Sequence, residues 1–115
     1  MISNTTDNCM LTVSDLKGKH SFCLTEIIRL EAADNYTIFY FAGHRSFVSS
    51  RVLKIYEALL LPYGFVRTHR SHLVNRQFIK KIDQTSIIMS DASIAEITKK
   101  KKKKILRQLH QPIDC

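Results

Sequence analysis

The sequence has little of the material that several large protein classes require. It contains no tryptophan and only three glycines, two prolines and three cysteines. No apolar run approaches the roughly 20 residues of a membrane span, and residues 1–8 are polar, unlike a signal peptide. Glycine-rich phosphate loops, the Gly-x-Ser-x-Gly elbow of hydrolases and paired-carboxylate motifs are all missing. We therefore expect a soluble, cytoplasmic protein that is not an enzyme and does not insert into a membrane.

The cysteines and histidines match no familiar disulfide or metal pattern. Cys9, Cys23 and Cys115 are an odd number without a C-x-x-C pair, which argues against a disulfide framework and fits a reducing compartment. We expect Cys23 to pack as a small hydrophobic residue and Cys115 to be a free thiol. His69 and His72 would face opposite sides of a single strand, and no cysteine or carboxylate lies near them in the sequence. The sequence predicts no metal site and no cofactor.

The length of 115 residues corresponds to one domain, and an apolar content of 44% argues against disorder. We expect a flexible lead over 1–9, a folded domain over 10–110 and a tail over 111–115. Apolar, aromatic and β-branched runs predict strands over the segments 10–13, 21–23, 26–32, 36–41, 45–48, 87–89 and 94–97.

Helical spacing of apolar residues predicts one central helix over 51–61, capped by Ser49 or Ser50. Residues 75–82 fit either a short helical turn or a strand, and residues 99–110 fit one or two helical turns. The predicted fold class is therefore mainly β, with one central helix and short helical turns.

Positive charge dominates the sequence. The 18 lysines and arginines outnumber the 10 acidic residues, which gives a formal charge of +8. Such a balance predicts a polyanionic partner, and nucleic acid is the first candidate. Within residues 65–75 the side chains of Arg67, His69, Arg70 and His72 lie between apolar residues. A cluster held by core residues presents a rigid basic edge, which a free basic tail cannot.

These polar residues differ in what they can contact. Arg70 lies where the chain must turn, so its guanidinium can reach a guanine edge or a phosphate. His69 is either a base contact or a half-buried structural residue, and Arg67 is either a phosphate contact or an ion-pair partner. Ser71 either donates to phosphate or caps the turn. Asn75 is expected to be structural, because asparagine commonly closes turns.

This segment resembles the signature of LytTR-type DNA-binding domains, which are modules of bacterial transcription factors. Their pattern Phe-x-Arg-x-His-Arg-Ser-x-x-Val-Asn is filled at every fixed position, by Phe65, Arg67, His69, Arg70, Ser71, Val74 and Asn75. Further blocks in the family's order are Ile28-x-Leu30-Glu31-Ala32, Asn35-Tyr36-Thr37 and Ile79-x-x-Ile82-Asp83. The resemblance covers roughly residues 10–109 and implies a LytTR-like, elongated β-sheet domain.

The resemblance also implies that loops from three places contact successive grooves of double-stranded DNA. In the first place the resemblance makes Asn35 and Thr37 candidate contacts, whereas composition alone favours a plain turn. The second place is the signature segment. In the third, the family carries arginine or another basic residue, whereas this chain has six lysines after Thr98. Lys99 and Lys100 are predicted to contact the DNA backbone, although a lysine run is often only a solvated face.

The sequence thus predicts a sequence-specific transcriptional regulator, similar to a response regulator but without a receiver domain. We expect a standalone protein or a fragment that binds promoter direct repeats without a phosphorylation switch. A dimer on DNA and a protein antagonist are further partners that the resemblance allows. One alternative is a non-specific RNA-binding or single-strand-binding module that stacks bases on Tyr36, Phe39 and Tyr40. The other is a peripheral membrane protein held on anionic lipid by its lysines.

Overall fold

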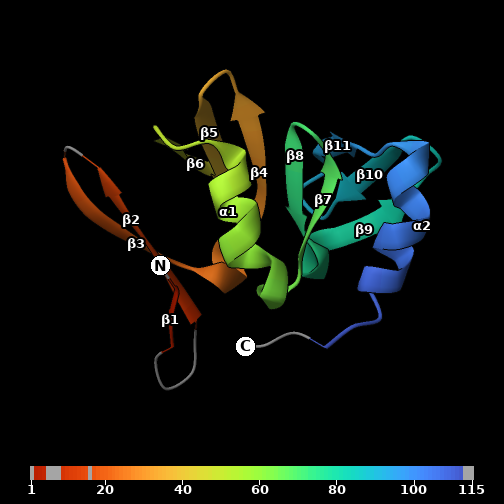
Figure 1. Cartoon of the computed structure of the whole chain (residues 1–115), viewed down its shortest axis with the longest axis horizontal. Helices are drawn as coiled ribbons and strands as arrows, with labels where there is room; N and C mark the ends of the chain where they lie inside the picture. The colour runs from red at the N-terminus through yellow and green to blue at the C-terminus, as the bar shows by residue number, and fades with distance from the viewer. Residues whose placement is uncertain (1, 5–8, 16, 113–115) are drawn as a thin grey trace.

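The computed structural model of the chain describes residues 2–4, 9–15 and 17–112 (Figure 1). A central antiparallel sheet of five strands has the order β6-β5-β4-β8-β7. Its strands are β4 (Ile27–Ala33), β5 (Tyr36–Phe41), β6 (Arg45–Ser49), β7 (Phe65–His69) and β8 (His72–Asn75). Strands β4 and β5 form one hairpin and β7 and β8 form another, and β4 pairs with β8 to join them. The tips of both hairpins therefore lie at the same end of the sheet (Figure 1).

Two smaller antiparallel sheets flank the central one. The first contains β1 (Ile2–Asn4), β2 (Cys9–Asp15) and β3 (Gly18–Cys23), and the second contains β9 (Ile79–Ile82), β10 (Ser86–Met89) and β11 (Ile94–Glu96). Residues 2–4 were expected in a flexible lead, but they pair with β2 in a regular register. The structure thus extends the ordered part of the chain toward its N-terminus.

Helix α1 (Leu53–Leu60) and helix α2 (Lys99–Gln108) both pack against β7. The short 3-10 turns η1 (Leu24–Glu26) and η3 (Arg76–Phe78) connect consecutive strands, and η2 (Leu61–Tyr63) joins α1 to β7. Within the described ranges, no helix combines the length and the apolar character that a membrane crossing requires.

The central sheet separates two hydrophobic cores. Neighbouring residues of β7 and β8 contribute to different cores, since Phe65 and Leu73 belong to one and Val66 and Val74 to the other. This follows from the alternation of side chains along a strand. The first core lies between the sheet, α1 and the β2–β3 hairpin, and the second lies between the sheet, β10, β11 and α2.

The predicted strands are all present, and the helices differ in their ends. Helix α1 begins at Leu53 rather than near 51, and neither predicted serine caps it, since its N-cap is Val52 without a side-chain hydrogen bond. The Ser49 hydroxyl bonds instead to the phenol of Tyr56, across the core. The segment 75–82 contains both predicted forms, a 3-10 turn and then β9. Helix α2 has ten residues, more than the expected one or two turns.

The cysteines follow the sequence-based expectation only in part. Cys23 is a free thiol, as expected for a residue that packs as a small hydrophobe. Cys9 is buried in the first core and is disulfide-bonded, a bond that the argument against a disulfide framework did not foresee. Cys115 lies outside the described residues.

Candidate nucleic-acid interface

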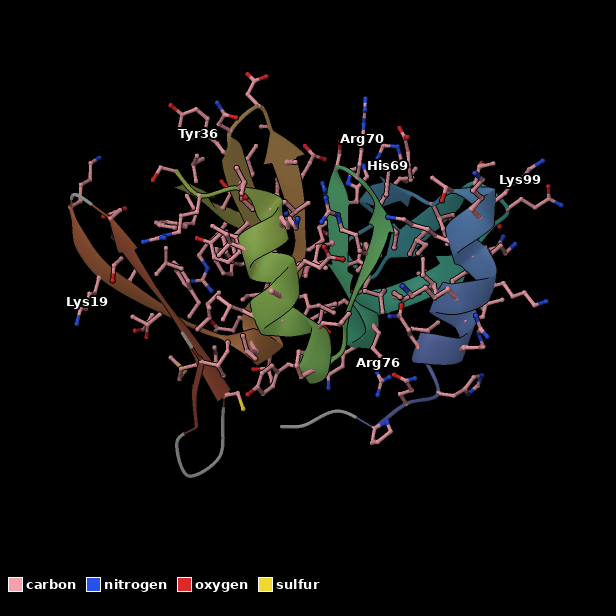
Figure 2. The ribbon with its side chains drawn as sticks, viewed as in Figure 1. Lys19, Tyr36, His69, Arg70, Arg76 and Lys99 are labelled. Carbon is pink, nitrogen blue, oxygen red and sulfur yellow. The ribbon has the colours of Figure 1, made fainter. Side chains whose placement is uncertain are left out.

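Three polar segments meet along one edge of the molecule. They are the β4–β5 turn at residues 34–35, the β7–β8 turn at residues 70–71, and the N-terminus of α2 at Lys99. Figure 2 shows Tyr36, His69, Arg70 and Lys99 along this edge, whereas Arg76 lies at the opposite end of the fold. We call this surface the upper edge. It brings together all three places that the sequence singled out.

Backbone hydrogen bonds fix these segments relative to each other. The Ala32 N–H, at the end of β4, donates to the Ser71 carbonyl at 2.8 Å and so ties the first turn to the second. The Thr98 N–H donates to the Thr68 carbonyl at 3.2 Å, which ties the start of α2 to β7. The three segments are therefore joined through the sheet and through α2 rather than standing as independent loops.

In the segment of the first turn, Asn35 is exposed to solvent and Thr37 is buried. Asp34 adopts a left-handed conformation with φ of 54°, and Asn35 is exposed beside it. Thr37 was predicted as a DNA contact, but its side chain is fully buried and its hydroxyl donates to the Arg51 carbonyl at 2.8 Å. Such a side chain offers no surface to DNA, so we leave Thr37 out of the interface.

Arg70 occupies the tip of the second turn. Its side chain is exposed and points away from the fold (Figure 2). Among the described residues, no hydrogen bond or ion pair engages its guanidinium. An arginine in this state keeps all its donors available for a ligand, in the planar arrangement that suits guanine or phosphate.

Arg67, by contrast, uses its guanidinium inside the protein. Nε donates to the His69 carbonyl at 2.9 Å, one terminal nitrogen donates to Glu57 Oε1 at 2.8 Å, and the other donates to the Arg70 carbonyl. The side chain is only 18% exposed. Of the two roles predicted for Arg67, these contacts favour the structural one, because they hold the turn that carries Arg70.

His69 and Ser71 complete the second turn. The Ser71 N–H donates to His69 Nδ1 at 3.1 Å, so a neutral His69 carries its proton on Nε2 and can donate outward. Nε2 lies 3.5 Å from Glu96 Oε2, on a carboxylate that is 70% exposed and can move aside. The side chain of His69 is one quarter exposed, and Ser71 is half-buried.

A second histidine lies beside the first. His69 and His72 are partners across the β7–β8 pair, with ring centroids 5.6 Å apart. The expectation that the two histidines face opposite sides is wrong, because it assumed one continuous strand. The turn at residues 70–71 places them on adjacent strands with their rings close together. No cluster of three metal-ligating side chains was found in the described part of the chain.

A buried polar network supports the turn, and the sequence analysis did not find it. Arg29 is 9% exposed and donates to Glu31 at 3.1 Å and to the Ser93 hydroxyl at 3.1 Å. Its guanidinium also covers the ring of Tyr40 at 4.1 Å from the centroid. His72 Nδ1 lies 3.7 Å from Glu31. The available signal was Arg29 and Glu31 two apart in an otherwise apolar strand, where both side chains share one face.

Burial governs the titration of His72. The pKa of its imidazole is lowered from the ordinary value, mainly because burial disfavours the charged form. The nearby Glu31 carboxylate opposes this shift, and the Arg29 guanidinium reinforces it. His72 is thus held neutral under the turn.

The lysine run forms a helix rather than a disordered tail. Thr98 is its N-cap and accepts a hydrogen bond from the Lys101 N–H at 3.3 Å. Lys99 and Lys100 are exposed in the first turn, which contains no acidic residue. Cations near the positive end of a helix dipole repel it, typically by about 0.3–1 kcal/mol each, so a bound anion would relieve the repulsion.

Comparisons with known proteins were made for the sequence and for the structure. The family model described as "LytTr DNA-binding domain" matches residues 17–110. The structure is similar to a solved structure from Bacillus cereus, the LytTr DNA-binding domain of a putative methyl-accepting/DNA response regulator. The TM-score is 0.73 at 22% identity, over 89% of this chain and 97% of the other. The search of curated proteins found no match.

Proposed function

The chain belongs to the LytTr DNA-binding domain family, and on this premise we propose that it is a sequence-specific regulator of transcription that binds double-stranded DNA through its upper edge. Domains of this family are DNA-binding domains of transcription regulators. The observation that carries the proposal is the placement of three polar segments, tied to each other by backbone hydrogen bonds, along one edge.

Different parts of the upper edge contact the DNA bases and the DNA backbone. The guanidinium of Arg70, which no other described residue engages, lies at the tip of a turn braced by Arg67 and suits bidentate contact with guanine in the major groove. His69, at the end of β7, and the exposed Asn35, in the β4–β5 turn, supply further donors. Lys99 and Lys100, with Ser71, contact phosphates, which sets affinity but carries little sequence information. The domain therefore presents turns, rather than a recognition helix, to the grooves.

Burial of the aromatic residues disfavours a base-stacking module. Phe39 is fully buried in the first core, and Arg29 covers the ring of Tyr40. Only Tyr36 of the three aromatic residues considered is more than half exposed, at 52%. One exposed ring does not form the successive platforms that bind single strands.

The proposal includes expectations about partners and control. The DNA sites are direct repeats in promoters, which would place two copies side by side on the duplex. The domain binds its site without a ligand or phosphodonor, in the cytoplasm. A protein antagonist would compete for the upper edge, where Arg70, Lys99 and Lys100 supply positive charge.

Selection of bound duplexes from a random pool tests this function. We expect a recovered consensus and a measurable preference for it over a scrambled duplex of equal length. Single-stranded DNA and RNA of the same sequence serve as competitors, and anionic vesicles serve as the membrane control. A pool without enrichment, or equal binding to the single strands, would contradict the proposal.

A further inference from the structure

A small cleft lies at the outer edge of β7, where both helices pack against this strand. Its volume is about 110 Å³. The residues around it come from α1, η2, β7 and α2, and they are Glu57, Leu61, Arg67, Lys101, Lys104, Ile105 and Gln108. This cleft is separate from the upper edge. Lys104 comes five residues after Lys99, or roughly 7.5 Å further along the helix axis.

The charges around the cleft do not balance. Three cations, Arg67, Lys101 and Lys104, face one carboxylate, and that carboxylate, Glu57, already pairs with Arg67. Neither lysine has an ion-pair partner among residues 2–4, 9–15 and 17–112. The arrangement therefore leaves two positive charges without a counterion.

The fold holds these lysines in place. Lys101 and Lys104 are three residues apart, so they lie on one face of α2. Ile105, directly after them, is 1% exposed and anchors that side of the helix in the second core. Lys101 and Lys104 thus project from one face of a helix whose backbone is anchored at Ile105.

We propose that this cleft binds a phosphate group, either as the free ion or as the end of a small phosphomonoester. The ammonium groups of the two lysines and the Arg67 guanidinium are the donors that bind phosphate most strongly. The small volume excludes a large aromatic ligand but accepts a tetrahedral oxyanion. Leu61, which is 45% exposed, supplies an apolar surface beside the cleft for the rest of a monoester.

Occupancy of the cleft would act on the turn through Arg67. Arg67 lines the cleft, and its guanidinium donates to the carbonyls of His69 and Arg70. A phosphate competes with Glu57 and with these carbonyls for its donors, and so loosens the turn that carries Arg70. This consequence for DNA rests on the proposed function, whereas the binding site itself does not.

A titration without DNA tests the site. Inorganic phosphate, phenyl phosphate and chloride are added at matched pH and ionic strength, and the Arg67 Nε–H and the backbone N–H signals are followed by NMR. We expect saturable shifts with the two phosphates and not with chloride. Tighter binding of phenyl phosphate would assign a monoester as the ligand, and tighter binding of inorganic phosphate would assign the free ion. Equal shifts with chloride would overturn the site.

Paired variants on the same helix sharpen the test. Lys101→Gln with Lys104→Gln removes two charges from the cleft, and Lys102→Gln with Lys103→Gln removes two charges outside it. We expect phosphate to bind about tenfold more weakly to the first variant and unchanged to the second. Equal weakening in both would show a general charge effect and overturn the site.

Duplex binding at matched ionic strength tests the coupling separately. Phosphate should weaken binding by the wild type and by the Lys102/Lys103 variant more than by the Lys101/Lys104 variant. Equal weakening in all three would contradict the coupling. If no preferred duplex exists, the proposed function fails, and the titration without DNA still decides whether the phosphate site is present.

Discussion

Two arginines three residues apart in the sequence have opposite environments in the structure. Arg67 gives all its contacts to Glu57 and to two carbonyls of the turn, whereas Arg70 extends from the tip of that turn. The first residue positions the second. At the scale of single residues, selectivity for DNA should therefore depend on both, by different routes.

Replacing Arg70 by alanine should affect specific binding most. We expect a loss of about 1–3 kcal/mol against the preferred duplex and a much smaller loss against random duplex, because contacts with base edges depend on sequence. Lys99→Ala serves as the comparison and should weaken both nearly equally. Equal losses for Arg70→Ala would make Arg70 a phosphate contact.

Replacing Arg67 by glutamine should loosen the turn. The change removes hydrogen bonds to three residues, and we expect the free energy of unfolding to fall by roughly 1–3 kcal/mol in urea denaturation. The ratio of affinities for preferred and random duplex should fall as well. Glu57→Gln, which removes only the ion pair, should have the smaller effect on that ratio. An unchanged ratio in Arg67→Gln would show that the brace has no part in recognition.

His72 should make stability depend on pH. Its folded pKa lies below the ordinary value of 6.5, so the unfolded chain binds more protons as the pH falls through this value. The contribution of His72 to stability is therefore complete above about pH 6.5 and is lost progressively below it, toward the folded pKa. Glu31 opposes this loss, while Arg29 and the neighbouring His69 favour it.

Urea denaturation between pH 7.5 and 5 measures this effect. The free energy of unfolding of the wild type should fall across this range, and His72→Gln should reduce the fall, because glutamine does not titrate. His110→Gln, at an exposed position, is the control and should leave the pH dependence unchanged. The same fall in wild type and His72→Gln would contradict the assignment.

At the scale of elements, α2 is held by a few specific contacts despite its polar sequence. Ile105 inserts into the second core, and Arg76 donates to the Gln108 carbonyl near the C-terminus of the helix at 2.8 Å. The Thr98 cap and its backbone bond to β7 fix the other end. These contacts place Lys99 at the upper edge and the two cleft lysines beside β7.

Ile105→Ala should detach or loosen this helix. A fully buried isoleucine replaced by alanine typically costs about 2–5 kcal/mol. Leu106→Ala removes a similar side chain from the next position, which is 43% exposed, and should cost much less. Guanidinium denaturation of both variants compares them directly. Equal costs would show that α2 is not anchored through Ile105.

The elements also show what the sequence could and could not predict. Alternation and β-branched residues located the strands, because burial of one or both faces imposes that pattern locally. The ends of α1 were not predictable, since the Ser49 hydroxyl that could cap the helix bonds to Tyr56 instead. Thr37 looked available for the same reason, because only the folded chain brings the Arg51 carbonyl to its hydroxyl.

At the scale of the whole molecule, the central sheet converts distant segments into one surface. Residues 34–35, 70–71 and 99–100 lie at one edge because β4 pairs with β8 and so joins the two antiparallel hairpins, and because α2 follows β11 and packs against β7. The sequence indicated the three segments, and the family resemblance indicated that they act together. The cleft of Arg67, Lys101 and Lys104 was not foreseen, since it depends on the packing of α2 against an edge strand.

The salt dependence of duplex binding tests the central claim most directly. The affinities for the preferred and a scrambled duplex are measured across a series of salt concentrations. Each neutralised phosphate should contribute a slope of roughly 0.9 log units per log unit of salt, and we expect about five or more phosphates. Both affinities should therefore fall steeply as salt is added, and the affinity for the preferred duplex should remain the higher of the two at every salt concentration. An affinity that does not change with salt concentration, or equal affinity for the two duplexes, would contradict sequence-specific binding through the upper edge.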